Sequence, residues 1–362
     1  MHKINSEFSE KIKQYGAFDI NACYNCGNCT AICPLSTEDN SFPRKMIRAT
    51  ILGLEDKINS SMDPWLCYYC GECSDTCPRD ADPGGLMMAL RRYQIRKFSL
   101  GKVADIFYNG FSSVFAWIIL TLLAIGGIYI FGNYPDMEKI NPLSMISLDT
   151  LHDGGIIAFI FLILLAFFQI YVMMKSVNGF KKKSFKFSES VKGFFDVLFK
   201  EVLAQKKFSE CEDKSRYIAH LSLVWGFIGL FIATITVMMI DLFISTQSTL
   251  KIIPKIIGIV SGLPAIYGSV YFLYKRGKQK DNYSKYSHHT DWIFIILIFL
   301  AILSGYALDI CRWSLFFKGY YVSFALHLII VFELIITLPF TKFSHLMYRP
   351  VALWLAELKN KE

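Results

Sequence analysis

Two cysteine-rich segments near the start of the chain constrain its structure more than any other feature. Residues 23–34 read CYNCGNCTAICP and residues 67–78 read CYYCGECSDTCP, so both follow the pattern C-x2-C-x2-C-x3-C-P. In two-cluster ferredoxins, the first three cysteines of such a run bind one four-iron cluster and the fourth cysteine binds the other. The duplicated pattern therefore predicts two [4Fe-4S] clusters that exchange their fourth ligands.

The predicted ligands form two sets of four. Cluster one takes Cys23, Cys26, Cys29 and Cys77. Cluster two takes Cys67, Cys70, Cys73 and Cys33. Gly27 and Gly71 lie inside the two loops. The backbone must pass close to the inorganic core there, which glycine allows because it has no side chain.

Other uses of these cysteines fit the pattern less well. Zinc sites usually pair two C-x2-C units across a long gap, and do not place three cysteines two residues apart. A disulfide framework is typical of small chains from oxidising compartments, whereas this chain has 362 residues. Cys211 and Cys311 lie outside the motifs, and we expect both to be ordinary, partly buried thiols.

The distribution of apolar residues predicts an all-α protein in two parts. Residues 1–100 have the composition of a soluble domain, and long apolar runs follow from about residue 112. Helical spacing of apolar residues in 1–22, 42–59 and 86–98, without strand patterns, predicts an α-helical ferredoxin domain at 1–100. Residues 101–362 are predicted to form a transmembrane helical bundle.

Six apolar runs in the second part are each long enough to cross a bilayer, which takes about 20 residues in a helix. They cover residues 113–132, 153–175, 218–243, 252–275, 291–311 and 318–340. Between the second and third runs, an apolar stripe among lysines predicts an amphipathic helix at about 188–208. This helix is expected either at the membrane interface or as a docking helix for a partner subunit.

Charge and the start of the chain predict the orientation in the membrane. The first residues lack the apolar core of a cleavable signal peptide. We therefore expect the head in the cytoplasm, where thiolates stay reduced. The loops and tail on that side hold eighteen Lys and Arg residues, against four in the outer loops. This bias predicts a multi-pass protein of the cytoplasmic membrane with both termini in the cytoplasm.

Four histidines lie inside the spans or at their ends, where an imidazole is costly unless it has a function or a partner. The predicted topology places His220 and His345 at the cytoplasmic side, and His152 and His327 toward the outer side. His327 and His345 are 18 residues apart, which would put them on one helix face. These two pairs predict two b-type haems stacked across a cytochrome b bundle. For His152, a hydrogen bond at the interface is an equal alternative.

Three further polar residues leave alternatives open. His288 and His289, in a predicted cytoplasmic loop, are expected to cap the fifth span or face water, but they are rival ligands for the inner haem. Glu333 lies near the middle of the sixth span. It is either a neutral acid bonded to a neighbouring helix or a proton-exchanging group beside a quinone.

These segments carry a family resemblance. CYNCGNCTAICP and WLCYYCGECSDTCPRDADPGG resemble the small iron-sulfur subunit of heterodisulfide reductases. RYIAHLSLVWGFIGLFIAT and ALHLIIVFELIITLPFTKFSHL are similar to their cytochrome b subunit and to the gamma subunit of respiratory nitrate reductase. The two parts fused in one chain resemble the membrane subunit of the quinone-interacting membrane-bound oxidoreductase complex of sulfate reducers.

The resemblance implies a protein with one or two b haems. It would exchange electrons between menaquinone and cytoplasmic flavin and iron-sulfur subunits similar to heterodisulfide reductase A, which serve adenylylsulfate reductase. The haem ligands carry over directly onto His220, His327 and His345. The nitrate reductase pattern has a second histidine ten residues after the first, where this chain has Leu230. The outer haem therefore takes His152 or is absent.

Several missing motifs narrow the function. The chain has no CCG-rich cysteine domain, no G-x-G-x-x-G at a strand–helix turn and no nucleophile–base constellation. We therefore expect no catalytic residue, no nucleic-acid partner and no complete enzyme in this chain alone.

The leading hypothesis is an electron conduit linked to sulfate reduction. One alternative is a haem-free membrane anchor that docks a soluble redox complex. Another is a cytochrome b and iron-sulfur subunit of a heterodisulfide-reductase-like complex. A transporter gated by the cluster domain is a weaker alternative, because the spans show no inverted repeat.

Overall fold

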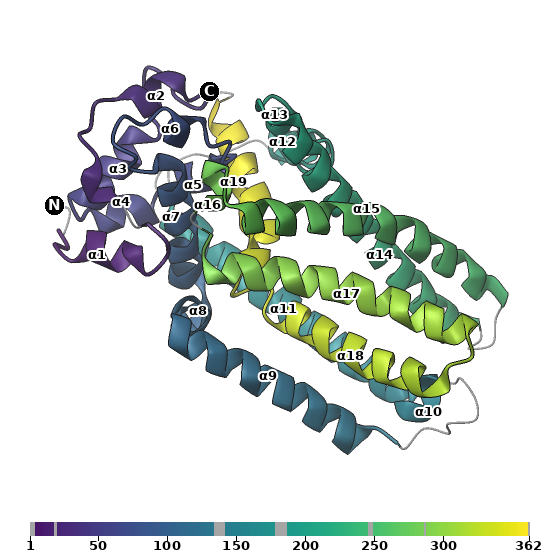
Figure 1. Cartoon of the computed structure of the whole chain (residues 1–362). Coiled ribbons are helices and arrows are strands. Elements are labelled where there is room, and N and C mark those ends of the chain that lie inside the picture. The colour runs from purple at the N-terminus through teal and green to yellow at the C-terminus, as the bar shows by residue number, and fades with distance from the viewer. Residues whose placement is uncertain are drawn as a thin grey trace.

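The computed structural model describes residues 4–17, 20–133, 142–177, 187–244, 249–285 and 287–360. This part of the chain is 79% helical and contains no strands. Figure 1 shows a head of short helices, from which long helices extend as a bundle. The predicted all-α fold is therefore confirmed.

The head consists of short helices with loops between them. Its helices are α1 (Phe8–Lys13), α2 (Asn28–Ile32), α3 (Arg44–Ile51), α4 (Glu55–Asn59), α5 (Asp63–Leu66), α6 (Glu72–Asp75) and α7 (Pro83–Phe98). The predicted helix at 42–59 is wrong, because Gly53, at φ 65°, separates α3 from α4. The predicted helix at 1–22 is also wrong, because Gly16, at φ 99°, ends the turn that follows α1. Among the described residues from there to Ala22, the helical part is a short 3-10 turn, η1 (Ile20–Ala22), while residues 1–3 and 18–19 of the predicted helix lie outside the described residues.

The core of the head continues into the membrane part. Helix α7 supplies much of it, and Tyr93 and Trp65 are fully buried there. The same apolar cluster includes Met173 and Tyr348, which belong to later helices. The Tyr348 hydroxyl donates a hydrogen bond of 2.9 Å to Gln169 Oε1. The cluster domain is thus packed onto the membrane part.

Six long helices follow the head. They are α9 (Gly110–Phe131), α11 (Leu148–Ser176), α14 (Lys214–Phe243), α15 (Ile252–Lys278), α17 (His289–Trp313) and α18 (Phe317–Ile336). All six are long and apolar enough to cross a membrane, which indicates a multi-pass membrane protein. Short helices flank them: α8 (Ala104–Tyr108), α10 (Pro142–Met145) and α16 (Asn282–Lys285).

The last span ends earlier than predicted. Helix α18 stops at Ile336 rather than at residue 340, and α19 (His345–Asn360) begins after a turn. The sequence contains the reason, because Pro339 has no amide hydrogen and disfavours helix at the residue before it. His327 therefore lies on α18 and His345 on α19. The expectation that they share one helix face is wrong.

Small residues hold α14 and α15 close together. A Cβ added at Gly226 would come within 2.6 Å of the Ser261 carbonyl oxygen. A Cβ at Gly268 would come within 2.5 Å of the Ala219 carbonyl oxygen. Only residues without a side chain allow this approach, which is a common way to pack helices in membranes.

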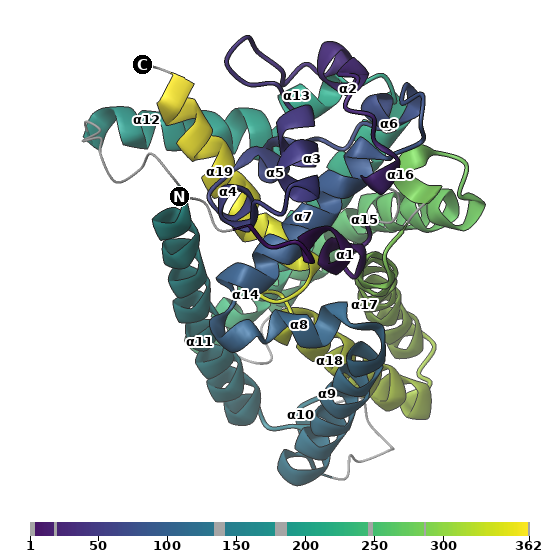
Figure 2. The ribbon, with the colours of Figure 1, turned by 90° about the vertical axis from the view of Figure 1, so that its left-hand side faces the viewer.

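The predicted amphipathic helix is present and has a partner within the chain. It consists of α12 (Phe187–Val197), a π-helical continuation η4 (Leu198–Leu203) and α13 (Lys206–Ser209). Trp354 of α19 donates a hydrogen bond of 2.9 Å to the Ser190 carbonyl. Figure 2 shows α12 and α19 beside the head. Binding at the membrane interface and docking of a partner both stay predictions.

Candidate functional site

The two cysteine loops have the same local structure. Gly27 and Gly71, at φ 94° and 101°, precede α2 and α6, which carry the third cysteine of each motif. Cys23 Sγ accepts a hydrogen bond of 3.3 Å from the amide of Asn25. Cys67 Sγ accepts one of 3.3 Å from the amide of Tyr69. Such bonds to sulfur are among the features that set the potential of a cluster.

The fourth cysteine of the second motif neighbours the first loop. Burial raises the pKa of the Cys29 thiol, and three nearby sulfurs raise it further. These are Cys23, Cys26 and Cys77. They are the residues predicted to share cluster one with Cys29.

The fourth cysteine of the first motif, Cys33, neighbours the second loop. Burial raises the pKa of Cys33 to about 11, against a backbone hydrogen bond from Leu35. Cys67 and Cys70 are among the sulfurs that raise the pKa further. Burial likewise raises the pKa of Cys73, which has the same neighbours. The sulfurs around Cys33 and Cys73 thus come mainly from the second motif, as an exchange of fourth ligands requires.

The donor set fits the proposed clusters. In the described ranges, no three His, Cys, Asp or Glu side chains are close enough to hold a single metal ion. A four-iron cluster instead spreads its four cysteines over four irons. Buried thiols bind as thiolates once iron supplies the compensating charge. Ligation by these eight cysteines stays a prediction.

The two loops differ in their exposure. Cys26 of the first loop is exposed, and its neighbour Tyr24 is 71% exposed. Cys67 of the second loop is only 7% exposed. The first loop therefore faces outward, and the second loop is covered by the rest of the chain.

Two arginines from the membrane part cover the second loop. Arg216 donates a hydrogen bond from Nη1 to the Tyr69 carbonyl. The guanidinium of Arg349 lies 4.3 Å from the centre of the Tyr68 ring. Arg216 lies one turn before His220 on α14, and Arg349 lies one turn after His345 on α19. The second loop thus rests against both helices that carry the predicted inner haem ligands.

His345 is held in the orientation of a metal ligand. Its Nδ1 lies 2.7 Å from the Lys342 carbonyl oxygen. A carbonyl only accepts, so Nδ1 carries the proton and Nε2 keeps its lone pair. Burial lowers the pKa of His345 to about 4, although the Lys342 carbonyl opposes this, so the ring is neutral. A neutral imidazole with Nδ1 bonded to an acceptor is the usual state of a metal-binding histidine.

His220 shows the same arrangement. Its Nδ1 lies 2.8 Å from Gln205 Oε1. Its neighbours include His345 and the cations Arg349 and Arg216. Within the described residues, neither His220 Nε2 nor His345 Nε2 forms a hydrogen bond. The structure therefore brings this pair together with the nitrogens that a haem iron would need.

The predicted outer pair is not joined in the same way. His327 Nδ1 lies 2.9 Å from Ser304 Oγ, whose hydroxyl donates to the Ala301 carbonyl, so Nδ1–H is the donor. His152 is partly buried on α11. The groups that act on His220 include His345, whereas His152 is not among the described groups that act on His327. Leu230, at the position of the missing histidine, packs against the apolar cluster of the bundle.

The rival histidines have structural partners. His288 caps α17, and its Nδ1 accepts from the Thr290 amide. Its Nε2 donates a hydrogen bond of 3.1 Å to the Gln14 carbonyl. His289 Nε2 donates one of 3.0 Å to the Phe107 carbonyl. Capping by His288 is confirmed, and both of its nitrogens are occupied.

Two features of the site had no signal in the sequence. Cys211 lies beside Cys70, and its hydrogen bond lowers the pKa of Cys70 to about 7. Asp291 is buried among three cations at the junction of head and bundle. Its carboxylate oxygens lie 2.5 Å from Arg92, 2.9 Å from Lys342 and 3.7 Å from Arg276. These partners come from distant segments, so no local spacing predicts them.

Two family models match the chain. Residues 19–81 match the 4Fe-4S dicluster domain. Residues 155–362 match the family described as citrate utilization protein B. The second match covers most of the membrane part.

The curated relatives match a shorter region. A protein of Archaeoglobus profundus that resembles the C subunit of heterodisulfide reductase is 35% identical over 103 residues, 28% of this chain and 55% of the relative. The C subunit of the H(2):CoB-CoM heterodisulfide,ferredoxin reductase of Methanothermobacter marburgensis is 41% identical over 63 residues, 17% of this chain and 34% of the relative. A C-type iron-sulfur subunit of the CoB--CoM heterodisulfide reductase of Methanocaldococcus jannaschii is 31% identical over 105 residues, 27% of this chain and 56% of the relative.

The chain thus spans about half, or less, of the length of these relatives. No solved structure matches it significantly. The matches confirm the resemblance of the head to heterodisulfide reductase iron-sulfur subunits.

Proposed function

Because the chain belongs to the citrate utilization protein B family and carries a 4Fe-4S dicluster domain, we propose that it is the membrane subunit of a redox complex. In this role it passes electrons between menaquinone and a soluble partner, through b haems and two [4Fe-4S] clusters. The observation that carries the proposal is the contact of the second cysteine loop with the helices of His220 and His345.

The packing supports an order for the centres. The first loop is the exposed one, so we place cluster one where a soluble partner docks. The second loop lies under Arg216 and Arg349, so cluster two is the neighbour of the inner haem. With these centres bound, the order partner, cluster one, cluster two and haem would carry electrons in either direction.

The residues around the inner pair suit a haem. His220 and His345 would hold its iron with the Nε2 lone pairs that their other hydrogen bonds leave free. The cations Arg216, Arg349 and Lys342 lie around His220, and their charge is opposite to that of haem propionates. A haem held there supplies one-electron exchange at the side of the bundle that faces the clusters. For the outer haem we retain His327 with His152.

The relatives and the resemblance suggest the partners. Three curated relatives are heterodisulfide reductase C proteins or similar to them. We therefore propose a flavin and iron-sulfur subunit of the heterodisulfide reductase A type as the soluble partner. As in the quinone-interacting complex, it would serve adenylylsulfate reductase. The name of the matched family favours a second candidate for the soluble partner, an enzyme of citrate utilisation.

We place the head and both termini on the cytoplasmic side. The excess of Lys and Arg in the loops and tail on the head side supports this orientation. A cysteine introduced in the exposed turn at Ser314 checks it, because a membrane-impermeant thiol reagent reaches this turn in intact cells only if the turn lies outside. Labelling of intact cells by such a reagent is the expected result.

Purification with bound partners tests the function. The protein in mild detergent should contain about eight irons in clusters, together with a low-spin b-type spectrum. Mass spectrometry of copurifying proteins then separates a flavoprotein of the heterodisulfide reductase type from an enzyme of citrate utilisation. A preparation with full clusters but no haem would support the haem-free anchor instead.

A further inference from the structure

Glu333 is a buried acid without a cationic partner in any described hydrogen bond or ion pair. It is 7% exposed and lies on α18 within the membrane bundle. Thr121 Oγ1 of α9 contacts both Glu333 Oε1 and the Trp117 carbonyl oxygen. The hydroxyl has one hydrogen. The hydroxyl therefore donates to Glu333 Oε1 or to the carbonyl. Because the carboxyl group is buried and faces no cation among the described residues, a neutral carboxylic acid with an exchangeable proton is favoured.

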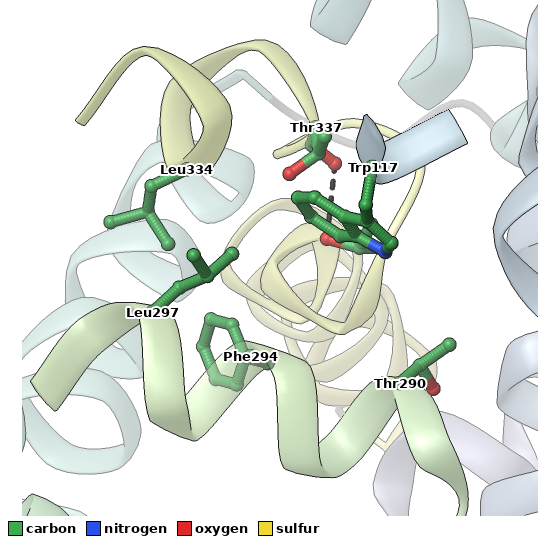
Figure 3. Close-up of a pocket in the computed structure, with 7 residues that line it drawn as sticks. Trp117, Thr290, Phe294, Leu297, Leu334 and Thr337 are labelled. Carbon is green, nitrogen blue, oxygen red and sulfur yellow. Dashed lines mark hydrogen bonds between the residues drawn. The ribbon is translucent and has the colours of Figure 1, made fainter. Parts of the chain in front are cut away.

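A small cavity lies next to this acid on the head side. Residues of α9, α17, the end of α18 and the turn after it line the cavity, as Figure 3 shows. They are Trp117, Thr290, Phe294, Leu297, Leu334, Thr337 and Thr341. Trp117 and Thr337 are each one helical turn from the Thr121–Glu333 pair, a rise of about 5.4 Å. The cavity has room for about one water molecule.

The lining of the cavity is mainly apolar, but it includes four residues with polar groups. Thr290, Thr337 and Thr341 present hydroxyl-bearing side chains. Trp117 Nε1 is buried and has no acceptor among the described residues. A water molecule needs two to four polar partners. These groups can supply them.

From the cavity, hydrogen bonds continue to the surface of the head. Thr290 Oγ1 lies 2.8 Å from His288 Nδ1. His288 Nε2 donates to the carbonyl of Gln14, which is an exposed residue. A neutral imidazole accepts on one nitrogen and donates from the other, so it can pass a proton across the ring. Around His288 lie Arg92, His289 and Asp291.

We propose that Glu333 exchanges protons with the aqueous phase on the head side through water in this cavity, Thr290 and His288. The carboxyl group of Glu333 crosses the one helical turn to the cavity by rotating toward Thr337. The proton leaves the carboxyl oxygen, passes the Thr290 hydroxyl and enters the ring at Nδ1, while the Nε2 proton departs to solvent beside Gln14.

The route has a use that rests on the proposed function. Oxidation of one quinol to a quinone releases two electrons and two protons. Bound haems would take the electrons. The protons would go one at a time to Glu333, each after the carboxyl group has released its previous proton along the route. Quinone reduction runs the same steps in reverse, with two protons taken up from the head side.

Hydrogen–deuterium exchange at Glu333 tests the route without any quinone. Infrared spectra of the full chain in deuterated buffer follow the carboxylic C=O band, and Glu333→Gln should remove that band. The variant His288→Asn keeps a capping side chain but cannot relay a proton. It should slow the exchange by about tenfold or more, and Thr290→Val should do the same.

Matched variants separate the route from structural damage. His289→Asn should exchange at the wild-type rate, and Thr290→Ser should restore the rate that Thr290→Val loses. Wild-type exchange rates in both His288→Asn and Thr290→Val would overturn the route. So would a band that survives Glu333→Gln. If exchange slows as expected but quinone never oxidises the protein, the route stands and the proposed function fails.

Discussion

Arg216 Nη1 donates a hydrogen bond to the backbone carbonyl of Tyr69, and the Arg216 guanidinium also lies 4.1 Å from the centre of the Tyr283 ring. Arg216 is 9% exposed. Its side chain therefore connects the loop between Cys67 and Cys70 to the helix that carries His220. This contact is one of the physical links between the head and the bundle.

Removal of Arg216 should weaken that link. Arg216→Ala leaves a buried carbonyl without its charged donor, and it should cost about 2 kcal/mol of stability. Electron transfer between clusters and haem should slow by about tenfold or more if the loop retracts, while both spectra remain. Thermal unfolding and flash reduction measure the two effects. Arg312→Ala, at an exposed position, should change neither.

The exchange of fourth ligands gives an unusual prediction for two variants. Cys33→Ser should remove the cluster of the second loop, and Cys77→Ser should remove the cluster of the first loop. The reason is that each cysteine neighbours the other motif. Electron paramagnetic resonance of the reduced protein distinguishes the two clusters. Cys311→Ser is the control and should keep both clusters. The exchange would be ruled out if Cys33→Ser removed the cluster of the first loop and Cys77→Ser removed that of the second loop.

Replacement of His220 or His345 by Ala should remove one low-spin haem and leave both clusters intact. Each variant takes away one of the two nitrogens that would bind the inner iron. His289→Asn should keep the haem, since His289 Nε2 is bonded to the Phe107 carbonyl. An unchanged spectrum in both alanine variants would mean that the inner haem has other ligands or is absent.

His152→Ala tests the outer haem. If His152 and His327 share an iron, this variant should lose the outer haem or turn it high-spin, and quinone-linked electron transfer should slow. The absorption spectrum of reduced minus oxidised protein measures the loss. A full two-haem spectrum in the variant would show that His152 is not a ligand. A single haem in the wild-type protein would instead indicate that the outer haem is absent, because Leu230 replaces the second histidine of the nitrate reductase pattern.

Stability should depend on pH through His288. Burial lowers the pKa of His288 to about 3 from its ordinary 6.5, and Arg92 adds to this. Between about pH 3 and pH 6.5, the unfolded chain therefore binds a proton at His288 that the folded chain does not bind. The contribution of the neutral His288 ring to the free energy of unfolding is complete above about pH 6.5, and it is lost as the pH falls toward 3. The loss between pH 7 and pH 5 is about 2 kcal/mol.

Thermal unfolding at these two pH values measures the effect. His288→Asn keeps the helix cap but has no titrating ring, so its unfolding temperature should fall less between pH 7 and pH 5. An equal fall in wild type and variant would show that other groups, such as the Asp291 cluster, set the pH dependence.

The sequence predicted those features that depend on neighbouring residues. The cysteine spacing and the six apolar runs are local patterns, and the six long helices agree with them to within a few residues. The end of α18 was missed because the apolar run continues past Ile336, although Pro339 marked the break. The helix at 42–59 was overextended because its apolar spacing outweighed Gly53.

The contacts between head and bundle could not be predicted in this way. Arg216 reaches Tyr69, and Arg92 reaches Asp291, from segments far apart along the chain. Neither pair lies within one helix or one motif, so no periodicity connects its members. Such contacts depend on how the helices pack in three dimensions.

The rate at which menaquinone oxidises reduced clusters tests the central claim most directly. Full-length protein in lipid nanodiscs is reduced with dithionite and mixed with menaquinone, while haem absorbance and cluster signals are followed together. We expect the haem and both clusters to reoxidise in the wild-type protein. In His220→Ala the clusters should stay reduced for at least about tenfold longer. Cluster reoxidation at the same rate in both proteins, or clusters that menaquinone never oxidises in the wild type, would contradict electron passage through the inner haem.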